Sequence, residues 1–209
     1  MKPEKESSEK NISTEEKIKS AARIVFHQKG FAAARTRDIA EEAGINLALL
    51  NYYFRSKEKL FNIVMLETFQ DFFSSIFSVF NDVDTSLEEK IEKFASNYID
   101  LLFREPEIPL FIVNEIRNNV GELMDKINIR NSVFNSEFVK QYNKAIKEGR
   151  IRNLSFQHFM MNFMGLLIFP FIAKPLFKEI NGLSDVQFNK VIEERKQLIP
   201  VWLKSIMTV

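Results

Sequence analysis

The chain has 209 residues, 45% of them hydrophobic, which is enough for a sizeable core in two structural units. Its formal net charge is only +1, so no overall field attracts the molecule to nucleic acid. The absence of cysteine excludes disulfides, thiol catalysis and thiolate metal sites, and two isolated histidines leave little for zinc chemistry. We therefore expect no metal, no cofactor and no enzymatic activity.

The charge is unevenly placed along the chain. Residues 1–60 carry 12 Lys and Arg against 9 Asp and Glu, whereas the remainder carries 17 against 19. Residues 1–12 are rich in Lys, Glu and Ser, which predicts a mobile tail and no signal peptide. The apolar run over residues 160–177 is interrupted by polar residues and two prolines, so it is a poor membrane span. We expect a cytoplasmic protein without membrane contact.

The first predicted helix covers residues 14–29. Ser13 and Glu16 have the spacing of a capping box, and apolar residues recur after them at helical spacing. Gly30 supplies the stop, and Phe31 is placed to fold back onto the helix.

Two short helices joined by a tight turn follow, over residues 36–43 and 46–54. Thr36 is the expected N-cap of the first helix, and Asn46 is the expected N-cap of the second. Gly44 stands between them, where a chain leaving a helix needs a left-handed residue.

The second of these helices has one face suited to burial. Leu50 and Phe54 are four residues apart and lie on the same face of an ideal helix. The opposite face carries Ala48, Leu49, Asn51 and Tyr52. A buried face on each helix and an exposed second helix form the helix-turn-helix that places its second helix in a DNA groove.

Residues 15–66 resemble the N-terminal DNA-binding domain of the tetracycline-repressor (TetR) family of bacterial transcriptional regulators. The resemblance is carried by the segments Lys29–Phe31, Thr36–Ala40, Ala43–Ile45 and Tyr53–Glu58. It covers about a quarter of the chain, and these motifs in this order are specific. The resemblance implies a homodimer with a DNA-binding head and a helical body that binds a small-molecule effector.

The whole chain predicts an all-α fold of about nine helices. Three domains are expected, namely the tail at 1–12, a helix-turn-helix domain at 13–56 and an effector-binding and dimerisation domain at 57–209. In the body, Gly121 is expected to interrupt one helix, and a long helix is expected from there to Glu148.

Several positions match residues that hold DNA phosphates in the family, namely Thr36, Tyr53 and Lys57, with Arg37 and Asn46 as further candidates. Each has an alternative duty. Thr36 and Asn46 could serve only as caps, and Lys57 could be a solvated charge.

The surface that would read bases departs from the family pattern. Many relatives resemble SKGTLYHYF, whereas this chain has NLALLNYYF over residues 46–54. Leu47, Ala48 and Leu49 cannot hydrogen-bond a base but can pack on a thymine methyl group, and Asn51 can bond adenine. With Tyr52 as a further reader, the sequence predicts a near-palindromic operator that leans toward A/T. Alternatively Leu47 or Leu49 packs into the domain.

The body is rich in phenylalanine, with 18 of the 21 Phe beyond residue 60. Candidate lining residues for an apolar or aromatic effector are Phe73, Phe77, Phe94, Tyr98, Phe111, Asn114, Met161 and Met164. The alternative is that these aromatic side chains form an ordinary core.

The last two predicted helices carry apolar stripes that the resemblance assigns to the dimer interface. They comprise Phe156, Phe159, Met160, Phe163, Leu167, Phe188, Val191, Ile192, Arg195, Ile199 and Trp202. The same stripes would also suit a core within one chain.

The favoured function is a homodimeric, effector-controlled repressor that binds double-stranded DNA. One alternative is an apolar-ligand carrier or sensor whose DNA head is vestigial, which Leu47 and Leu49 slightly favour. Another is a DNA-binding protein whose body docks a second protein.

Overall fold

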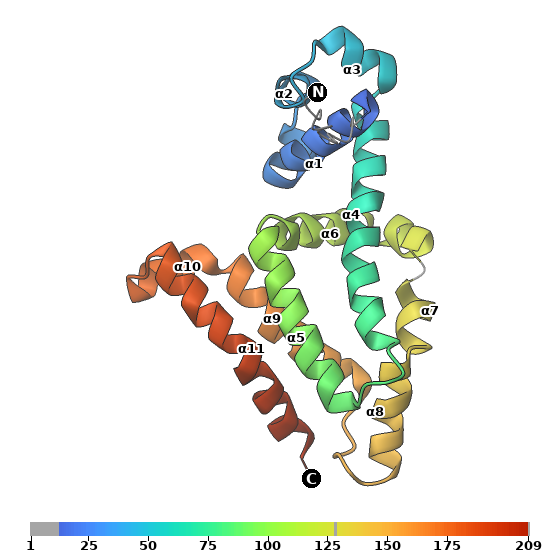
Figure 1. Cartoon of the computed structure of the whole chain (residues 1–209), viewed down its shortest axis with the longest axis vertical. Coiled ribbons are helices and arrows are strands. Elements are labelled where there is room, and N and C mark those ends of the chain that lie inside the picture. The colour runs from blue at the N-terminus through green and yellow to red at the C-terminus, as the bar shows by residue number, and fades with distance from the viewer. Residues whose placement is uncertain (1–12, 128, 209) are drawn as a thin grey trace, which may run out of the picture. The chain divides into compact units, whose positions relative to one another are not determined.

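The computed structural model of the chain describes residues 13–127 and 129–208, with the side chains of residues 118–120 and 122–131 outside the description. The predicted tail at residues 1–12 also lies outside it. In the described part every regular element is an α-helix, and there are eleven of them (Figure 1). The prediction of an all-α fold is confirmed.

The helices form two compact units. The described residues up to Thr68 belong to one unit, and Phe69 begins the other. The division falls inside one continuous helix, α4 (Lys57–Phe80), so no linker separates the two units. The expected functional domain boundary between residues 56 and 57 stays a prediction.

The N-terminal unit contains α1 (Thr14–Ala33), α2 (Thr36–Glu42), α3 (Leu47–Tyr53) and the first turns of α4. The α1 cap is as expected, with the Ser13 hydroxyl accepting the Glu16 N–H at 3.2 Å. Helical geometry breaks at Gly30, which has φ 69° and ψ 172°, and a last short turn follows.

Apolar side chains from all four helices fill the core of this unit. Ile18 and Phe26 of α1, Ile39 of α2 and Leu50 of α3 are almost fully buried. The Phe26 ring meets the Phe61 ring of α4 edge to face, with centroids 5.0 Å apart. This packing fixes α3 by one face, because the helix has only seven residues and could not persist alone.

The C-terminal unit holds the rest of α4 and seven further helices. These are α5 (Leu87–Arg104), α6 (Ile108–Ile127), α7 (Ile129–Phe134), α8 (Glu137–Lys147), α9 (Phe156–Ile172), α10 (Lys174–Asn181) and α11 (Asp185–Met207). Side-chain hydroxyls cap α5, α8, α9 and α11, each accepting the backbone N–H three residues on.

Two expectations about the middle of the body were wrong. Gly121 does not interrupt α6, because a glycine inside a helix costs only about 1 kcal/mol relative to alanine. The long helix expected to reach Glu148 is instead divided, since Ser136 caps a new helix and its hydroxyl accepts the Val139 N–H.

The end of the chain also contains one helix more than expected. Pro170 lies inside α9 rather than after it, and the chain turns at Ala173 before α10 begins. The axes of α9 and α10 differ by 67°. Together with the division at Ser136, this extra helix explains why eleven helices replace the predicted nine.

Among the described helices, α4 alone is long and apolar enough to cross a membrane by length and composition, and the bent pair of α9 and α10 passes the same test together. Of the most apolar window of α4, 44% is buried inside the protein. A core helix has the same composition, so these features are weak indications of a membrane span.

Candidate nucleic-acid interface

The turn before α2 is held by an acidic side chain. The N-cap of α2 is Arg35, whose backbone N–H donates to the Asp38 carboxylate at 3.3 Å. Lys29 donates to the same carboxylate at 2.9 Å, and this hydrogen bond is the main cause of the lowered Asp38 pKa. The expectation that Thr36 caps α2 is wrong, because Thr36 is the first helical residue and Asp38 holds the turn.

Thr36 and Arg37 lie at the start of α2. Arg37 is exposed and Thr36 is half-buried. The first N–H groups of a helix have no partner inside it, so this end of α2 offers donors as well as the Arg37 guanidinium. Both residues are therefore placed where a DNA phosphate could meet them.

The start of α3 is built as predicted. Gly44 takes a left-handed conformation with φ 66°, and Asn46 follows as the N-cap. The Asn46 side-chain oxygen accepts the Leu49 N–H at 2.8 Å. Leu50 and Phe54 are 1% and 7% exposed, so the face that anchors α3 is the one expected from their spacing.

The remaining side chains of α3 are at the surface. Ala48, Asn51, Tyr52 and Tyr53 are exposed, with Tyr52 showing 78% of its surface. The two tyrosine rings meet edge to face, with centroids 5.4 Å apart. Apolar and aromatic side chains on a free helix face match a surface that contacts a partner.

Leu47 and Leu49 have the same partial exposure. Each shows 36% of its surface, whereas the neighbouring Leu50 shows 1%. In the structure, therefore, neither Leu47 nor Leu49 packs into the core, as the alternative would require. Both leucines remain at the surface as candidates for apolar contact with bases.

The Lys57 ammonium is engaged inside the unit. Its Nζ donates to the carbonyl oxygens of Phe31 at 2.8 Å and of Ala34 at 3.1 Å. It also lies 4.2 Å from the centroid of the Phe31 ring. An ammonium has three donors, so two are used to tie the start of α4 to the end of α1. Lys57 is therefore not simply a solvated charge, and its ammonium is not available to a phosphate alone.

Three exposed cations flank the helix-turn-helix that the sequence patterns did not single out. They are Arg35 before α2, Arg55 after α3 and Lys59 in the first turn of α4. Their signal was present in the basic excess of residues 1–60. Because the whole chain is nearly neutral, such local cations would have to supply the attraction to phosphates.

His27 is part of the support behind the helix-turn-helix. Its Nε2 lies 3.1 Å from the hydroxyl of the buried Thr68 on α4. Burial, assisted by the nearby positive charge of Arg23, lowers the His27 pKa to about 4. The imidazole is therefore neutral at physiological pH and acts as a structural hydrogen-bonding group.

This constellation matches known proteins. Residues 18–64 fit the family described as "Bacterial regulatory proteins, tetR family". The Probable HTH-type transcriptional regulator YttP of Bacillus subtilis (strain 168) is 23% identical over 201 residues, covering 93% of this chain and 94% of the relative. Residues 18–64 therefore form a helix-turn-helix head of the tetR type, and the protein is a DNA-binding transcriptional regulator.

Solved structures show that the tetR-like fold extends through the body. The ketosteroid transcriptional regulator KstR2 of Mycobacterium tuberculosis is 17% identical with a TM-score of 0.66, over 94% of this chain and 96% of that one. FadR from Bacillus subtilis, in complex with stearoyl-CoA, is 18% identical with a TM-score of 0.61, over 91% and 98%. At this identity the likeness concerns the fold alone.

The residues expected to line an effector pocket are scattered through the body. Phe94, Tyr98 and Phe111 are at most 4% exposed, and ring contacts tie them into the core. Phe73, Phe77 and Met164 are half-buried, and Asn114 and Met161 are exposed. Met161, at 72% exposed, points to solvent, so it does not join the others around one cavity in a single chain.

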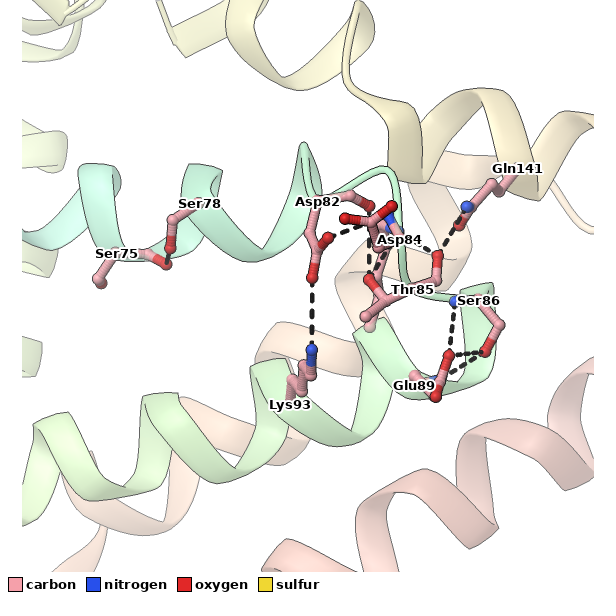
Figure 2. A network of polar contacts seen from close by, with 10 residues as sticks. Ser75, Ser78, Asp82, Asp84, Thr85, Ser86, Glu89, Lys93 and Gln141 are labelled. Atoms are coloured by element: carbon pink, nitrogen blue, oxygen red, sulfur yellow. Dashed lines mark hydrogen bonds and ion pairs between the residues drawn. The ribbon is translucent and has the colours of Figure 1, made fainter.

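The turn between α4 and α5 contains a buried lysine. Lys90 has no exposed surface, and its Nζ donates to the Thr85 carbonyl oxygen at 2.6 Å and to the Thr85 hydroxyl at 3.0 Å. Burial lowers the Lys90 pKa. Figure 2 shows Gln141 of α8 reaching the same carbonyl oxygen, at 2.9 Å.

The same turn is closed on its outer side by charged groups. Figure 2 also shows Asp82 paired with Lys93 at 3.3 Å and Glu89 accepting the Ser86 N–H at 2.7 Å. The network joins the turn between α4 and α5 to α5 and α8. It therefore acts as a structural joint of the body.

The residues expected at the dimer interface divide into two groups. Phe156, Phe159, Phe163, Leu167, Phe188, Ile192 and Ile199 are at most 9% exposed in the single chain. A side chain with so little free surface cannot contribute much to a second copy, so these seven belong to the core of one body. Met160, Arg195 and Trp202 are half-buried, and Val191 is 47% exposed.

Proposed function

We propose that this regulator is a homodimeric repressor that places two α3 helices in successive major grooves of a near-palindromic operator. Half-sites one helical turn apart, about 34 Å, suit a two-fold symmetric helix-turn-helix dimer. The observation that carries the proposal is the free face of α3, where Asn51 and Tyr52 are exposed on a helix anchored by the buried Leu50.

Within this proposal the contacts divide by chemistry. Phosphates are met by Thr36, Arg37, Asn46 and Tyr53, with the third donor of Lys57 available to a phosphate once two are used by carbonyls. Bases are read by Asn51 and Tyr52, with apolar contact from Leu47, Ala48 and Leu49. This set favours adenine and the thymine methyl group, which supports an operator that leans toward A/T.

The assignment of Asn51 can be tested by replacing it with alanine. A bidentate pair with a base contributes about 1–3 kcal/mol of discrimination, so N51A should bind operator about ten-fold or more weakly. Asn51 is exposed, so the unfolding curve should not change. Equal operator affinity of N51A and the unmodified chain in a gel-shift titration would remove Asn51 from the reading set.

The homodimer is supported by exposed apolar side chains on the last helices. Met161 and Phe169 of α9 and Val191, Leu198 and Val201 of α11 show between 40% and 72% of their surface. Such a stripe on α9 and α11 matches a pair of helices that completes a four-helix bundle with a second copy. These exposed residues replace the buried ones in the proposed interface.

Release by a small-molecule effector is proposed by analogy with relatives such as FadR, whose structure holds stearoyl-CoA. Phe73, Phe77 and Met164 remain candidates as half-buried side chains of the body. An effector can change DNA affinity only by its differential affinity for two conformations of the dimer. We expect the protein to act in the cytoplasm without a cofactor or enzymatic activity.

The alternative in which the body docks another protein has one observation in its favour. Leu176 and Ile180 of α10 are 57% and 70% exposed and stand four residues apart on one helix face. The carrier with a vestigial DNA head is disfavoured, because α3 keeps its cap, its anchoring face and its exposed polar readers.

A further inference from the structure

A hollow of about 320 Å³ lies among α9, α10 and α11. Its walls are mainly apolar and include Pro170, Phe177, Leu183, Phe188 and Ile192. Two polar residues, Asn181 and Arg195, complete the lining. This volume is at the lower end of the range of small-molecule sites, about 300–1,000 Å³, and the mix of an apolar wall with few polar groups is typical of such sites.

Arg195 brings an uncompensated positive charge to this hollow. Its Nη2 donates to the Leu166 carbonyl oxygen at 2.6 Å, and its guanidinium lies 5.1 Å from the centroid of the Trp202 ring. Among the described residues no carboxylate forms an ion pair with it. A guanidinium has five N–H donors in a fixed fork, so donors remain for an anion.

The surroundings add to the positive character. Lys174 and Lys178 share one carboxylate, that of Asp185, at 2.7 and 2.8 Å. Lys174 also lies 5.5 Å from the centroid of the Phe188 ring, which lines the hollow. Two ammonium groups with one carboxylate leave an excess of positive charge at this rim, in addition to that of Arg195.

Half-burial makes the charge of Arg195 costly without a partner. Desolvation lowers the pKa of this guanidinium, which means that its surroundings disfavour the charged form. A carboxylate beside the fork would offset this cost and form two parallel hydrogen bonds. The apolar wall beyond it would hold a hydrocarbon chain.

We infer that the α9–α11 hollow binds an amphipathic monocarboxylate, with its carboxylate on Arg195 and its hydrocarbon tail against Phe177, Phe188 and Ile192. This site is separate from the aromatic residues expected to line a pocket in the body. It deepens the proposed effector control, on which its consequence for DNA binding rests, by naming an effector class and a location.

A fluorescent side chain next to Arg195 can report on binding in the hollow. Trp202 is the only tryptophan in the chain, and its ring lies under the Arg195 guanidinium. A carboxylate that draws the guanidinium toward itself changes the charge beside the indole. Binding should therefore change the tryptophan fluorescence of the full-length protein.

The test is a fluorescence titration with decanoate, kept below its micelle concentration, and with 1-decanol as the uncharged probe of equal chain length. Decanoate should saturate the signal at a concentration at least ten-fold lower than decanol. Arg195→Met should weaken decanoate binding about ten-fold or more, since it removes charge-assisted hydrogen bonds. Arg152→Met removes an exposed charge of the same body and should leave the titration unchanged.

A second variant keeps the test decisive if Arg195→Met does not fold. Leu183→Phe enlarges a half-buried side chain in the wall of the hollow and should also weaken decanoate binding. Equal binding of decanoate and decanol, or full decanoate affinity in both variants, would overturn the assignment. A third outcome would also overturn the assignment. If R195M dissociated a dimer and the unmodified chain showed no response to decanoate, the hollow would be a contact surface for a second copy of the chain.

The proposed function can fail separately from this site. Operator binding by the unliganded chain tests the DNA-reading proposal and involves no decanoate. A chain that binds operator but not decanoate contradicts only the carboxylate site. A chain that binds decanoate with the predicted selectivity but no operator supports the site and contradicts only the proposed repressor.

Discussion

The helices α3 and α9 are both poor in charge, yet they lie very differently in the protein. Of the seven residues of α3 only Leu50 is buried, and the leucines and tyrosines beside it remain at the surface. In α9 the side chains of Phe156, Phe159, Phe163 and Leu167 are buried within one chain. Apolar composition alone therefore does not distinguish a surface kept for a partner from a core.

The difference follows from how much each helix must contribute to its own unit. The N-terminal unit already has a core from α1, α2 and α4, so one anchoring face of α3 suffices and the other is free. The body depends on its aromatic side chains for its core. Phe80, Phe94, Phe138, Phe159 and Phe163 form a chain of ring contacts with centroid distances between 4.6 and 5.9 Å.

The largest expected effect separates two adjacent leucines of α3. Leu50→Ala should lower the free energy of unfolding of the N-terminal unit by about 2–5 kcal/mol, because it leaves a cavity under the helix. Leu49→Ala should change it by less than about 1 kcal/mol and instead weaken DNA binding. Urea unfolding of both variants measures the contrast, and equal destabilisation would show that α3 has no free face.

A second prediction concerns the two histidines. Below pH 6.5 the His27 side chain is protonated in the unfolded chain. In the folded chain it stays neutral until the pH approaches its lowered pKa of about 4. Stability should therefore fall as the pH drops from about 6.5 to 4, by on the order of 3 kcal/mol. His27→Gln should flatten this fall in pH-dependent unfolding, whereas His158→Gln, at an exposed position, should keep it.

Substitutions at Lys57 and Lys59 can distinguish structural support from DNA contact within the N-terminal unit. Lys57→Met removes two charge-assisted hydrogen bonds and should cost about 1–2 kcal/mol of stability. Lys59→Met, which removes an exposed charge two residues away, should cost almost nothing. If Lys57 also contacts a phosphate, the slope of log operator affinity against log salt concentration should be smaller in K57M by about one. Unchanged stability of K57M would contradict its structural role.

The smallest expected effect tests the exposed stripe of the body. Val201 is 63% exposed on α11, so Val201→Glu should not disturb folding but should place a charge in the proposed dimer interface. The dimer dissociation constant should rise about ten-fold or more, which corresponds to about 1.4 kcal/mol. Val83→Glu, at a 73% exposed turn residue, is the control in sedimentation experiments. A dimer unaffected by V201E would exclude this face.

The local signals in the sequence predicted much of the structure. The caps at Ser13 and Asn46 and the turn at Gly44 are decided within a few residues, and all are present as expected. The expected cap at Thr36 was wrong because Asp38 holds the same turn, and the expected break at Gly121 was wrong because one glycine inside a helix costs only about 1 kcal/mol.

Long-range features were harder to predict. Helical spacing shows that the side chains of α9 form an apolar stripe, but it does not show whether that stripe meets another helix of the chain or a second chain. Phe94 and Met161 fit one predicted pocket by composition, yet one is buried and the other is exposed. The carbonyl partners of Lys57 lie 23 and 26 residues away, so spacing alone could not reveal them.

The central claim is that the free face of α3 reads DNA in a two-fold symmetric dimer. Selection of bound sequences from random double-stranded DNA tests it most directly. We predict a near-palindrome whose half-sites are centred about one helical turn, 34 Å, apart and lean toward A/T. Recovery of no enriched sequence, or of single half-sites without a fixed spacing, would contradict the account.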